Sequence, residues 1–264
     1  MQILDKGVYT GKIIDQLKNE GVYINTIHYT LESDNTGDHC HSNPHLCYLL
    51  QGNDVEKRDN KIYTRNGGDV FFYQSGEAHE TVQINQFMKS LLVEFDSSFL
   101  KKYDLDETKL EKALKKNSHV KLSMLKILKE MRILDDTNSI TSIQLNLLNI
   151  CSISEYSSKK APEWLTKVEE LVKDNWDSSI SLDDLAIAVN IHPVTISKYF
   201  AKFHKETLSE YMRKIKVEHS LSLIKNSNKT LTEIAHDCGF ADQSHFIRCF
   251  KDATNYLPKD FRKL

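Results

Sequence analysis

Four histidines in the first third of the chain have the side chains best suited to holding a ligand: His39, His41, His45 and His79. Successive residues of a strand point to opposite faces, so His39 and His41 lie on one face of an extended segment. Imidazole nitrogens bind transition metals, and neutral imidazoles beside aromatic rings also suit a polar organic molecule. We therefore expect a binding site lined by these histidines with Tyr48, Phe72 and Tyr73.

A second group of residues, close to the C-terminus, is suited to contact with DNA. Lysine pairs with phosphates or guanine, arginine reads guanine, glutamine reads adenine, and apolar methyl groups contact thymine. The candidates are Val194, Thr195, Ser197, Lys198, Lys202, Gln243, Ser244, His245, Arg248 and Lys251. Two alternatives stay open: Val194 packs on a neighbouring helix, and the lysines only solvate a surface.

The DNA-binding candidates fall on a pattern of two helices and a tight turn that occurs twice. The first copy has apolar residues at helical spacing over 182–189, a break at 190–193, and a second stripe that ends near 203. The second copy runs over 231–240, has a polar break at Asp242, and continues over 243–253. This spacing predicts two helix-turn-helix units, whose base-reading side chains lie early in the second helix.

The segment that joins the two copies predicts a single helix. From Thr207 to about Lys225, apolar residues recur at helical spacing without proline or glycine. At 1.5 Å per residue, this helix is roughly 28 Å long. Successive major grooves on one side of B-DNA lie about 34 Å apart. We therefore expect this helix to act as a rigid strut that holds two recognition helices in adjacent grooves.

Local signals indicate where these helices begin. Pro193 suits the first position of a helix, where its missing N–H costs nothing. Asp242 suits the N-cap of the helix over 243–253. Two pairs of residues resemble capping boxes that start the first helix of each unit: Ser181 with Asp184, and Thr230 with Glu233.

Composition places the chain among globular proteins. Its 264 residues and 40% hydrophobic content suffice for two domains with cores. No apolar run approaches the roughly 18 residues of a membrane helix, and the first residues lack a signal pattern, so we expect a cytoplasmic protein. Five cysteines without a CxxC pair argue against a disulfide framework and a zinc ribbon.

The net charge of −2 is unusual for a protein that binds nucleic acid. From Ser178 onward, however, 13 Lys and Arg residues stand against 10 Asp and Glu residues. The basic residues cluster on or beside the predicted recognition helices and strut, whereas several acidic ones fall on the first helix of each unit. A polarised surface therefore remains compatible with DNA binding.

The N-terminal half predicts a barrel or sandwich of short strands, followed by helices. Strands are expected at 23–29, 46–51, 61–64, 69–73, 80–84 and 88–95, with turns at 51–54 and 66–69. Apolar stripes at 122–131 and 140–150 predict an antiparallel helical hairpin with a turn at 135–138. One interpretation of the stripes is that they pack on the strands. The expected divisions are 1–96, 97–157, a linker at 158–163, and 164–264.

Many motif residues recur at fixed offsets in the C-terminal hundred residues. They are Leu185-Ala186, Ile196-Ser197-Lys198-Tyr199-Phe200, Tyr211, Arg213, Ile234-Ala235, Gly239-Phe240, Asp242, Ser244, Phe246, Arg248, Phe250-Lys251, Pro258, Phe261 and Arg262. Residues 165–263 thereby resemble the AraC/XylS family of transcriptional regulators, which implies that Gln243, Ser244 and Arg248 touch DNA. That family usually has glycine in the turn after each recognition helix, whereas this chain has Lys205 and Asn255.

The N-terminal motifs are similar to the cupin pattern of that family's effector domain. They are the histidine-rich run 39–45, Gly52, Gly68-Asp69-Val70 and His79-Glu80. In metal-binding cupins, two histidines at i and i+2, an acidic residue shortly afterwards and a distant histidine converge. Because 46–50 contain no acidic residue, we expect a small-molecule pocket and no cofactor; a metal site and a pocketless barrel are the alternatives.

Together the resemblances imply an α+β multidomain protein with a cupin-like β-barrel, a helical hairpin and an all-α domain of two helix-turn-helix units joined by a long helix. The implied function is that of a sequence-specific transcriptional regulator, not an enzyme, which responds to a sugar or another polar metabolite. Double-stranded DNA, RNA polymerase and a second copy of the chain are the expected partners, and the resemblance implies that one of the stripes at 122–131 and 140–150 forms the dimer interface. The alternatives are a constitutive DNA-binding regulator whose barrel only dimerises, and a metal-dependent cupin enzyme.

Overall fold

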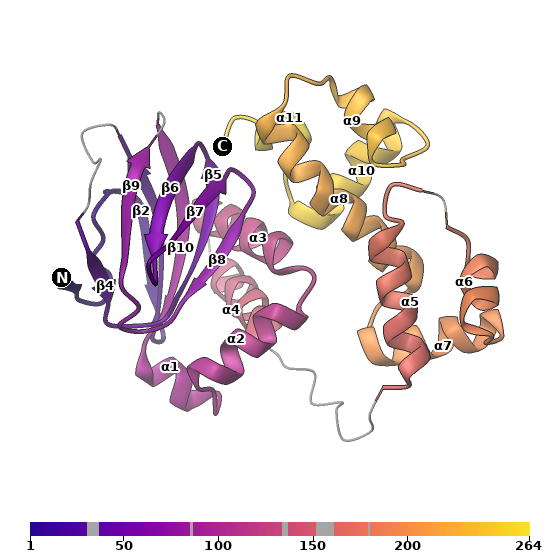
Figure 1. The fold of residues 1–264 in the computed structure, drawn as a ribbon, viewed down its shortest axis with the longest axis horizontal. Coiled ribbons are helices and arrows are strands. Elements are labelled where there is room, and N and C mark those ends of the chain that lie inside the picture. The colour runs from indigo at the N-terminus through magenta and orange to yellow at the C-terminus, as the bar shows by residue number, and fades with distance from the viewer. Residues whose placement is uncertain (31–36, 85–86, 134–136, 152–160, 179) are drawn as a thin grey trace. The chain divides into compact units, whose positions relative to one another are not determined.

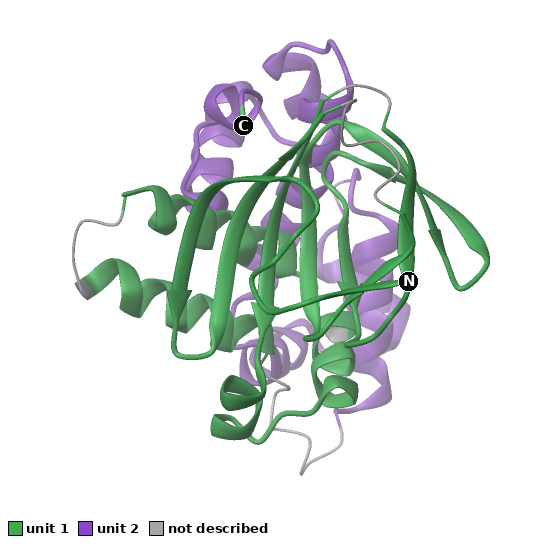
Figure 2. Cartoon of the chain, turned by 90° about the vertical axis from the view of Figure 1, so that its left-hand side faces the viewer, with its two compact units in different colours: residues 1–151, 264 green, residues 152–263 purple. Residues whose placement is uncertain are grey.

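A computed structural model describes residues 1–30, 37–84, 87–133, 137–151, 161–178 and 180–264 of the chain (Figure 1). The chain divides into two compact units, one formed by residues 1–151 with Leu264 and one by residues 152–263 (Figure 2). Among the described residues, none of the helices has the length and apolar character needed to cross a membrane. The α+β class and the order of a sheet-rich half before a helical half are confirmed.

Among the residues that the structure describes, the N-terminal unit contains two five-stranded sheets. The first has the order β1-β4-β9-β6-β7, and the second has the order β2-β3-β10-β5-β8. The strands of the first sheet are β1 (Gln2–Leu4), β4 (His39–His41), β9 (His79–Ile84), β6 (Asn53–Arg58) and β7 (Lys61–Asn66). Those of the second sheet are β2 (Lys12–Asn19), β3 (Val22–Tyr29), β10 (Met88–Phe95), β5 (His45–Gln51) and β8 (Val70–Tyr73).

Apolar and β-branched runs form the centre of the second sheet. Strand β10 pairs antiparallel with β3 on one side and β5 on the other, and most of its side chains are buried. The sequence predicts these three strands to within one residue at each end. In contrast, it does not predict β2 and β6, because polar residues occupy most of their positions and no apolar alternation marks them.

A two-residue turn sets the register of the β6–β7 hairpin. Asp59 and Asn60 both have left-handed backbone angles, with φ values of 49° and 60°. Turns of this kind match the twist of paired strands. The resulting register places Asp54 opposite Arg65, which positions two charged residues of the site described below.

The described part of the N-terminal unit also has four helices: α1 (Ser97–Lys102), α2 (Glu107–Lys116), α3 (Val120–Ile133) and α4 (Thr137–Cys151). The helical hairpin is confirmed as α3 and α4, which pack against each other. Most of both predicted apolar stripes is buried, as Leu125 and Ile150 illustrate. Residues 135 and 136 of the predicted turn lie outside the described part of the chain.

The C-terminal unit is entirely helical in its described part. Its helices are α5 (Glu163–Asp174), α6 (Leu182–Val189), α7 (Pro193–His204), α8 (Leu208–Asn226), α9 (Leu231–Asp237), α10 (Gln243–Thr254) and α11 (Pro258–Phe261). Both predicted helix-turn-helix units are therefore present, as α6–α7 and α9–α10. The strut is α8, with 19 residues and a length of about 28 Å.

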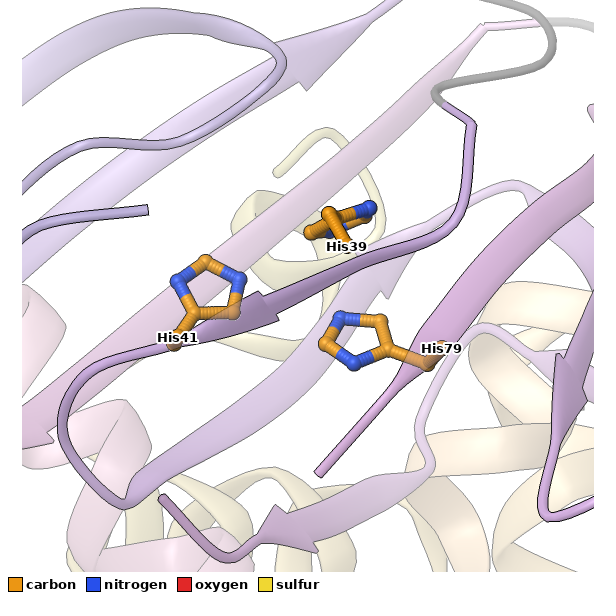
Figure 3. A group of neighbouring side chains, drawn as sticks. All are labelled: His39, His41 and His79. Atoms are coloured by element: carbon orange, nitrogen blue, oxygen red, sulfur yellow. The ribbon is translucent and has the colours of Figure 1, made fainter. Parts of the chain in front are cut away.

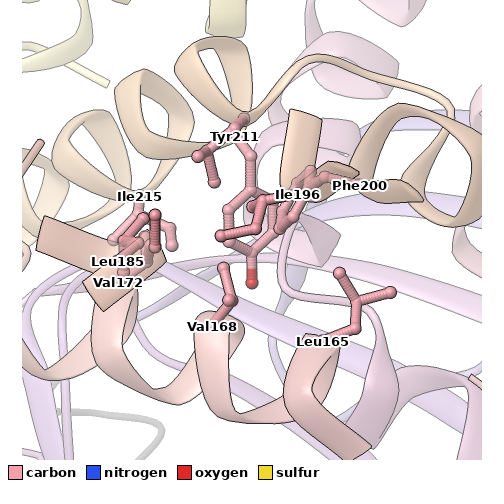
Figure 4. Close-up of a cluster of buried hydrophobic side chains, with 10 residues drawn as sticks. Leu165, Val168, Val172, Leu185, Ile196, Phe200, Tyr211 and Ile215 are labelled. Atoms are coloured by element: carbon pink, nitrogen blue, oxygen red, sulfur yellow. The ribbon is translucent and has the colours of Figure 1, made fainter. Parts of the chain in front are cut away.

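Each helix-turn-helix unit has its own buried centre. In the first, Leu165 and Val168 of α5 pack with Leu185 of α6, Phe200 of α7 and Tyr211 of α8 (Figure 4). The Phe200 ring meets the Tyr211 ring edge-on, with centroids 5.1 Å apart. This contact fixes α7 to the N-terminal half of the strut.

The second unit has an aromatic centre. The rings of Phe246 and Phe250 in α10 lie 5.7 Å apart, and Phe250 packs on Phe261 of α11 at 5.6 Å. All three side chains are fully buried. Because α10 also packs on α8, the second recognition helix is fixed to the strut as well.

The predicted caps are confirmed. Ser181 with Asp184 and Thr230 with Glu233 form capping boxes, and Asp242 Oδ1 accepts a 2.8 Å hydrogen bond from His245 N. Pro193 occupies the start of α7. A further capping box, Thr207 with Glu210, starts α8.

Lys205 and Asn255 end the two recognition helices in the left-handed conformation, with φ values of 62° and 63°. Glycine adopts this conformation without strain, and asparagine tolerates it better than lysine. The chain therefore keeps the turn geometry that glycine usually provides, at a cost that is largest at Lys205.

Candidate ligand cavity and DNA-reading helices

A small cavity of about 30 Å³ lies between the two sheets of the N-terminal unit. Side chains from both sheets line it, and they include Thr10, Tyr29, His39, His41, His45, Cys47, Glu56, Arg65, Tyr73, His79, Thr81, Met88, Ser90 and Leu92. A cavity of this size holds a water molecule or an ion, whereas pockets for drug-sized ligands measure about 300–1,000 Å³. As described, the cavity is therefore far too small for a sugar.

Three of the four histidines that line this cavity bring a nitrogen atom close together. His39 and His41 come from β4, and His79 lies directly opposite His39 on the paired strand β9. Figure 3 shows the three rings close together, and one nitrogen of each ring lies within 4.8 Å of those of the other two. All three side chains are buried. The sequence-based expectation that His79 meets the pair on β4 agrees with these positions.

Hydrogen bonds orient two of these rings. Nδ1 of His39 lies 3.0 Å from the carbonyl oxygen of Gly37, and Nδ1 of His79 lies 3.0 Å from that of Glu77. A carbonyl oxygen only accepts hydrogen bonds, so each Nδ1 carries the proton and donates it. In the neutral ring, Nε2 then has a free lone pair.

Burial favours the neutral form of His41, His45 and His79. Loss of water, reinforced by the neighbouring histidines, lowers the pKa of His41 to about 4 and that of His79 to about 3. The same two causes lower the pKa of His45 well below its usual value. The neutral form is the one that accepts hydrogen bonds and binds metals.

A buried group of charges borders the histidines. Arg65 Nε donates a 2.7 Å hydrogen bond to Asp54, and Arg65 also pairs with Glu56 at 2.6 Å. The hydroxyl of Tyr73 donates to Glu56 at 2.9 Å. Burial raises the pKa of Glu56, and the Arg65 guanidinium opposes that rise. Two carboxylates against one guanidinium leave this group with a formal charge of −1.

Two of the predicted site residues, Tyr48 and Phe72, do not line the cavity. Tyr48 and His45 are three positions apart in β5, so their side chains point to opposite faces of the sheet. Phe72 precedes Tyr73 in β8, and only Tyr73 faces inward, where its ring stacks on that of His45 at 4.7 Å. Phe72 instead borders an open surface groove.

Other residues of the cavity were not predicted. Glu56 supplies a carboxylate to its lining, although from β6 and not from the segment 46–50 where an acidic residue was sought. Charged residues on polar strands are ordinarily exposed, so composition did not single out Glu56 or Arg65. The turn residues Asp59 and Asn60 were a signal in the sequence that could have revealed this pair. A hairpin that turns there places Asp54 opposite Arg65.

The first recognition helix, α7, exposes most of its predicted DNA contacts. Val194 is 67% exposed, so it does not pack into the strut. Ser197, Lys198 and Lys202 are exposed, and Thr195 is half-buried. Ile196 and Phe200 form the opposite, buried stripe.

The second recognition helix, α10, is built in the same way. Ser244, Arg248 and Lys251 are exposed, whereas Gln243 and His245 are half-buried. The Gln243 Oε1 atom accepts a 2.6 Å hydrogen bond from the Thr232 hydroxyl, and the His245 ring packs edge-on against Phe240 at 5.6 Å. This hydrogen bond uses one of the two lone pairs of Oε1, so the second remains for the adenine amino group.

Gly239 shapes the turn between α9 and α10. It has a φ of +67°, and a Cβ atom there would lie 2.8 Å from the carbonyl oxygen of Asp177. Its own carbonyl oxygen accepts a 2.8 Å hydrogen bond from Lys216 Nζ on the strut. Glycine at this position therefore satisfies both the backbone angle and the close approach.

Each half of the chain matches a known protein family. Residues 21–148 match the family described as the AraC-like ligand binding domain. Residues 185–264 match the family described as the helix-turn-helix domain.

Several curated regulators are similar in sequence. The HTH-type transcriptional activator RhaR of Mannheimia succiniciproducens is 18% identical over 239 residues, which cover 85% of this chain and 86% of that protein. The uncharacterized HTH-type transcriptional regulator YijO of Escherichia coli strain K12 is 28% identical over 96 residues, and GbdR of Pseudomonas aeruginosa is 28% identical over 99 residues. The chain spans 34% and 27% of the lengths of YijO and GbdR, respectively.

Among solved structures, ToxT from Vibrio cholerae is 14% identical, with 92% of this chain and 98% of that chain covered and a TM-score of 0.38.

Proposed function

Because the chain belongs to the AraC/XylS-type family of DNA-binding transcriptional regulators, we propose that it reads promoter DNA with α7 and α10 and that an effector in its N-terminal cavity alters this binding. The observation that carries the proposal is the paired construction of the C-terminal unit. Two helix-turn-helix units pack on one continuous helix, α8, and each has a recognition helix that buries one stripe and exposes the other.

The exposed residues fall into two groups, those suited to contact bases and those suited to contact phosphates. Arg248 suits the paired acceptors of guanine, and Val194 suits a thymine methyl group. Lys202 and Lys251 suit phosphates, which position the protein without reading sequence. Ser244 hydrogen-bonds either base edges or phosphates. Sequence preference therefore depends on Arg248 and Val194, whereas Lys202 and Lys251 contribute affinity that falls with salt.

The proposed effector acts through linkage. The protein has one conformation that binds DNA and one that does not. A ligand that binds the first conformation more tightly strengthens DNA binding, and a ligand that binds the second more tightly weakens it. Support comes from the match of residues 21–148 to a ligand-binding family and from a small cavity lined by convergent polar groups.

A homodimer and a contact with RNA polymerase belong to the same proposal. Burial of the α3 and α4 stripes leaves those residues unavailable to a second subunit. Leu145 on α4 is 58% exposed and is an apolar side chain that a second subunit can cover. Sedimentation at several concentrations, with Leu145→Glu as the variant, tests this assignment.

Selection of bound DNA from a random pool tests the function directly. We expect the full-length chain to enrich a motif with two half-sites about one helical turn apart. Repetition with candidate sugars, aromatic metabolites and metal ions identifies a ligand that changes the enrichment. Failure to enrich any motif under every condition would contradict the proposal.

A further inference from the structure

We propose that the histidine cavity is a binding site for one divalent transition-metal ion such as Zn²⁺, held by His39, His41 and His79, and that this ion is the effector. The effector role rests on the proposed function above, whereas the metal site itself stands on the geometry of the cavity. The inference thereby revises the expected effector from a sugar or polar metabolite to a metal ion.

The hydrogen bonds of the two opposed histidines give the orientation that metal ligands require. Histidines that bind metals usually donate their second N–H to a carbonyl or carboxylate, which fixes the tautomer and aims the other nitrogen at the metal. His39 and His79 each make this contact with the backbone, to Gly37 and Glu77 respectively. Their Nε2 lone pairs are thereby available to an ion.

His41 completes the group. Its side chain is 5% exposed, and within the described part of the chain its Nδ1 atom has no hydrogen-bond partner. A buried polar nitrogen without a partner is costly. Its ring lies 5.5 Å from the rings of both His39 and His79. Coordination of an ion would give the His41 ring a polar partner that the described part of the chain does not supply.

The spacing of the three nitrogens suits an ion after a small adjustment. Zn–N bonds of about 2.0–2.1 Å in a tetrahedral site place ligand nitrogens roughly 3.3 Å apart. The ligand atoms here lie within 4.8 Å of one another, so the rings must approach by up to about 1.5 Å. Neutral imidazoles have no attraction that draws them together, and an ion supplies it.

The volume of the cavity and the three imidazole ligands both indicate which class of ion can bind. A cavity of about 30 Å³ accommodates an ion with one water, but not an organic molecule of sugar size. Three imidazoles suit Zn²⁺, Co²⁺, Ni²⁺, Cu²⁺ or Fe²⁺, whereas Mg²⁺ and Ca²⁺ prefer oxygen ligands. The three protein ligands leave one tetrahedral position for water.

The charge of the surroundings is favourable to a dication. The three ligands are uncharged, so the ion's charge must be balanced by neighbours. Glu56 lines the same cavity, and its group with Asp54 and Arg65 carries a formal charge of −1. A cavity intended for an anion would not place a net negative group beside its ligands.

The ion would also join two strands that share little else. Strands β4 and β9 pair at a single register position, His39 opposite His79. Strand β4 in turn pairs with β1 at the edge of the sheet. Metal binding would therefore hold strands β1 and β4 more firmly against β9. The change in the position of these edge strands is the structural difference between the metal-free and the metal-bound unit.

Metal titration of the full-length chain tests the site. We expect the metal-depleted protein to bind one equivalent of Zn²⁺, and X-ray absorption of the loaded wild type to show three nitrogen ligands at about 2.0–2.1 Å. His39→Gln and His79→Gln should each weaken binding by at least about 10- to 100-fold, the range that loss of even an outer-shell partner produces. His28→Gln is the matched control, since His28 lies on β3 in the same unit but does not line the cavity.

Absence of a bound equivalent in the wild type, or unchanged affinity in His79→Gln, would overturn the metal site. The absorption spectrum of the wild type tests the ligand set even if a histidine variant fails to fold: a site dominated by sulfur or oxygen contradicts the assignment.

The effector role has a separate readout. Anisotropy with the selected DNA should show at least a fivefold difference in affinity between metal-depleted and Zn²⁺-loaded protein. Equal affinity in the two forms refutes the effector role while the site stands. Loss of all sequence preference in both forms refutes the proposed function instead.

Discussion

Arg248 and Lys202 provide a matched pair of substitutions that separates base reading from phosphate contact. Both side chains are exposed and lie on recognition helices, Arg248 in α10 and Lys202 in α7. We expect Arg248→Ala to weaken binding to the selected site by about 1–3 kcal/mol, or about 5- to 150-fold, because a paired contact with guanine is lost. Base preference at one position of the site should relax at the same time.

Lys202→Ala should behave differently. Its ammonium lies 5.7 Å from the centre of the Tyr199 ring, and the position suits a phosphate contact. Loss of one such contact lowers the slope of log K against log salt by about 0.9 and weakens all sequences alike. Exposed side chains of this kind change the free energy of unfolding by no more than about 0.5 kcal/mol, so folding should be unaffected.

The assay is fluorescence anisotropy with the selected site and with a set of single-base variants, at four salt concentrations. Thermal unfolding of each protein is the control. Wild-type affinity and base preference in Arg248→Ala would refute the assignment of α10 to the groove. A change in base preference in Lys202→Ala would refute its assignment to the backbone.

Four further substitutions test backbone conformation and packing. Lys205→Gly should stabilise the C-terminal unit by about 1 kcal/mol in denaturant unfolding, because it removes a left-handed lysine; Asn255→Gly should gain less, and equal gains would contradict this reason. Phe250→Ala should cost about 3–5 kcal/mol, since the ring is fully buried between Phe246 and Phe261; a loss below 1 kcal/mol in the same assay would contradict the described packing. Arg65→Leu should lower the free energy of unfolding by about 3–5 kcal/mol, because two buried carboxylates lose their cation; unchanged stability would show that Asp54 and Glu56 are not both charged.

The C-terminal unit was predictable because its signals are local. Ser181, Thr230 and Asp242 each cap a helix by accepting a hydrogen bond from the residue three positions further on. Pro193 fixes the start of α7 without reference to any distant residue. Helix ends set by neighbours in sequence are visible in the sequence, and the predicted bounds of α6, α7, α8 and α10 agree with the structure to within one residue, whereas α9 ends three residues before the predicted 240.

The N-terminal cavity was predictable only in part. Alternation placed His39 and His41 on one face, but the same rule applied to β5 would have separated Tyr48 from His45. The partnership of Arg65 with Asp54 depends on pairing across a hairpin, and apolar patterning carries no information about which charged residues are buried. The volume of the cavity depends on how all its side chains pack, so sequence spacing did not reveal that it is too small for a sugar.

The central claim is that α8 presents α7 and α10 side by side to one flank of a duplex. Hydroxyl-radical footprinting of the full-length protein on its selected site measures this most directly. We expect two protected segments on one face of the DNA, with centres about 10 base pairs apart, and loss of the segment contacted by α10 in Arg248→Ala. A single protected segment, or two segments on opposite faces of the duplex, would contradict the claim.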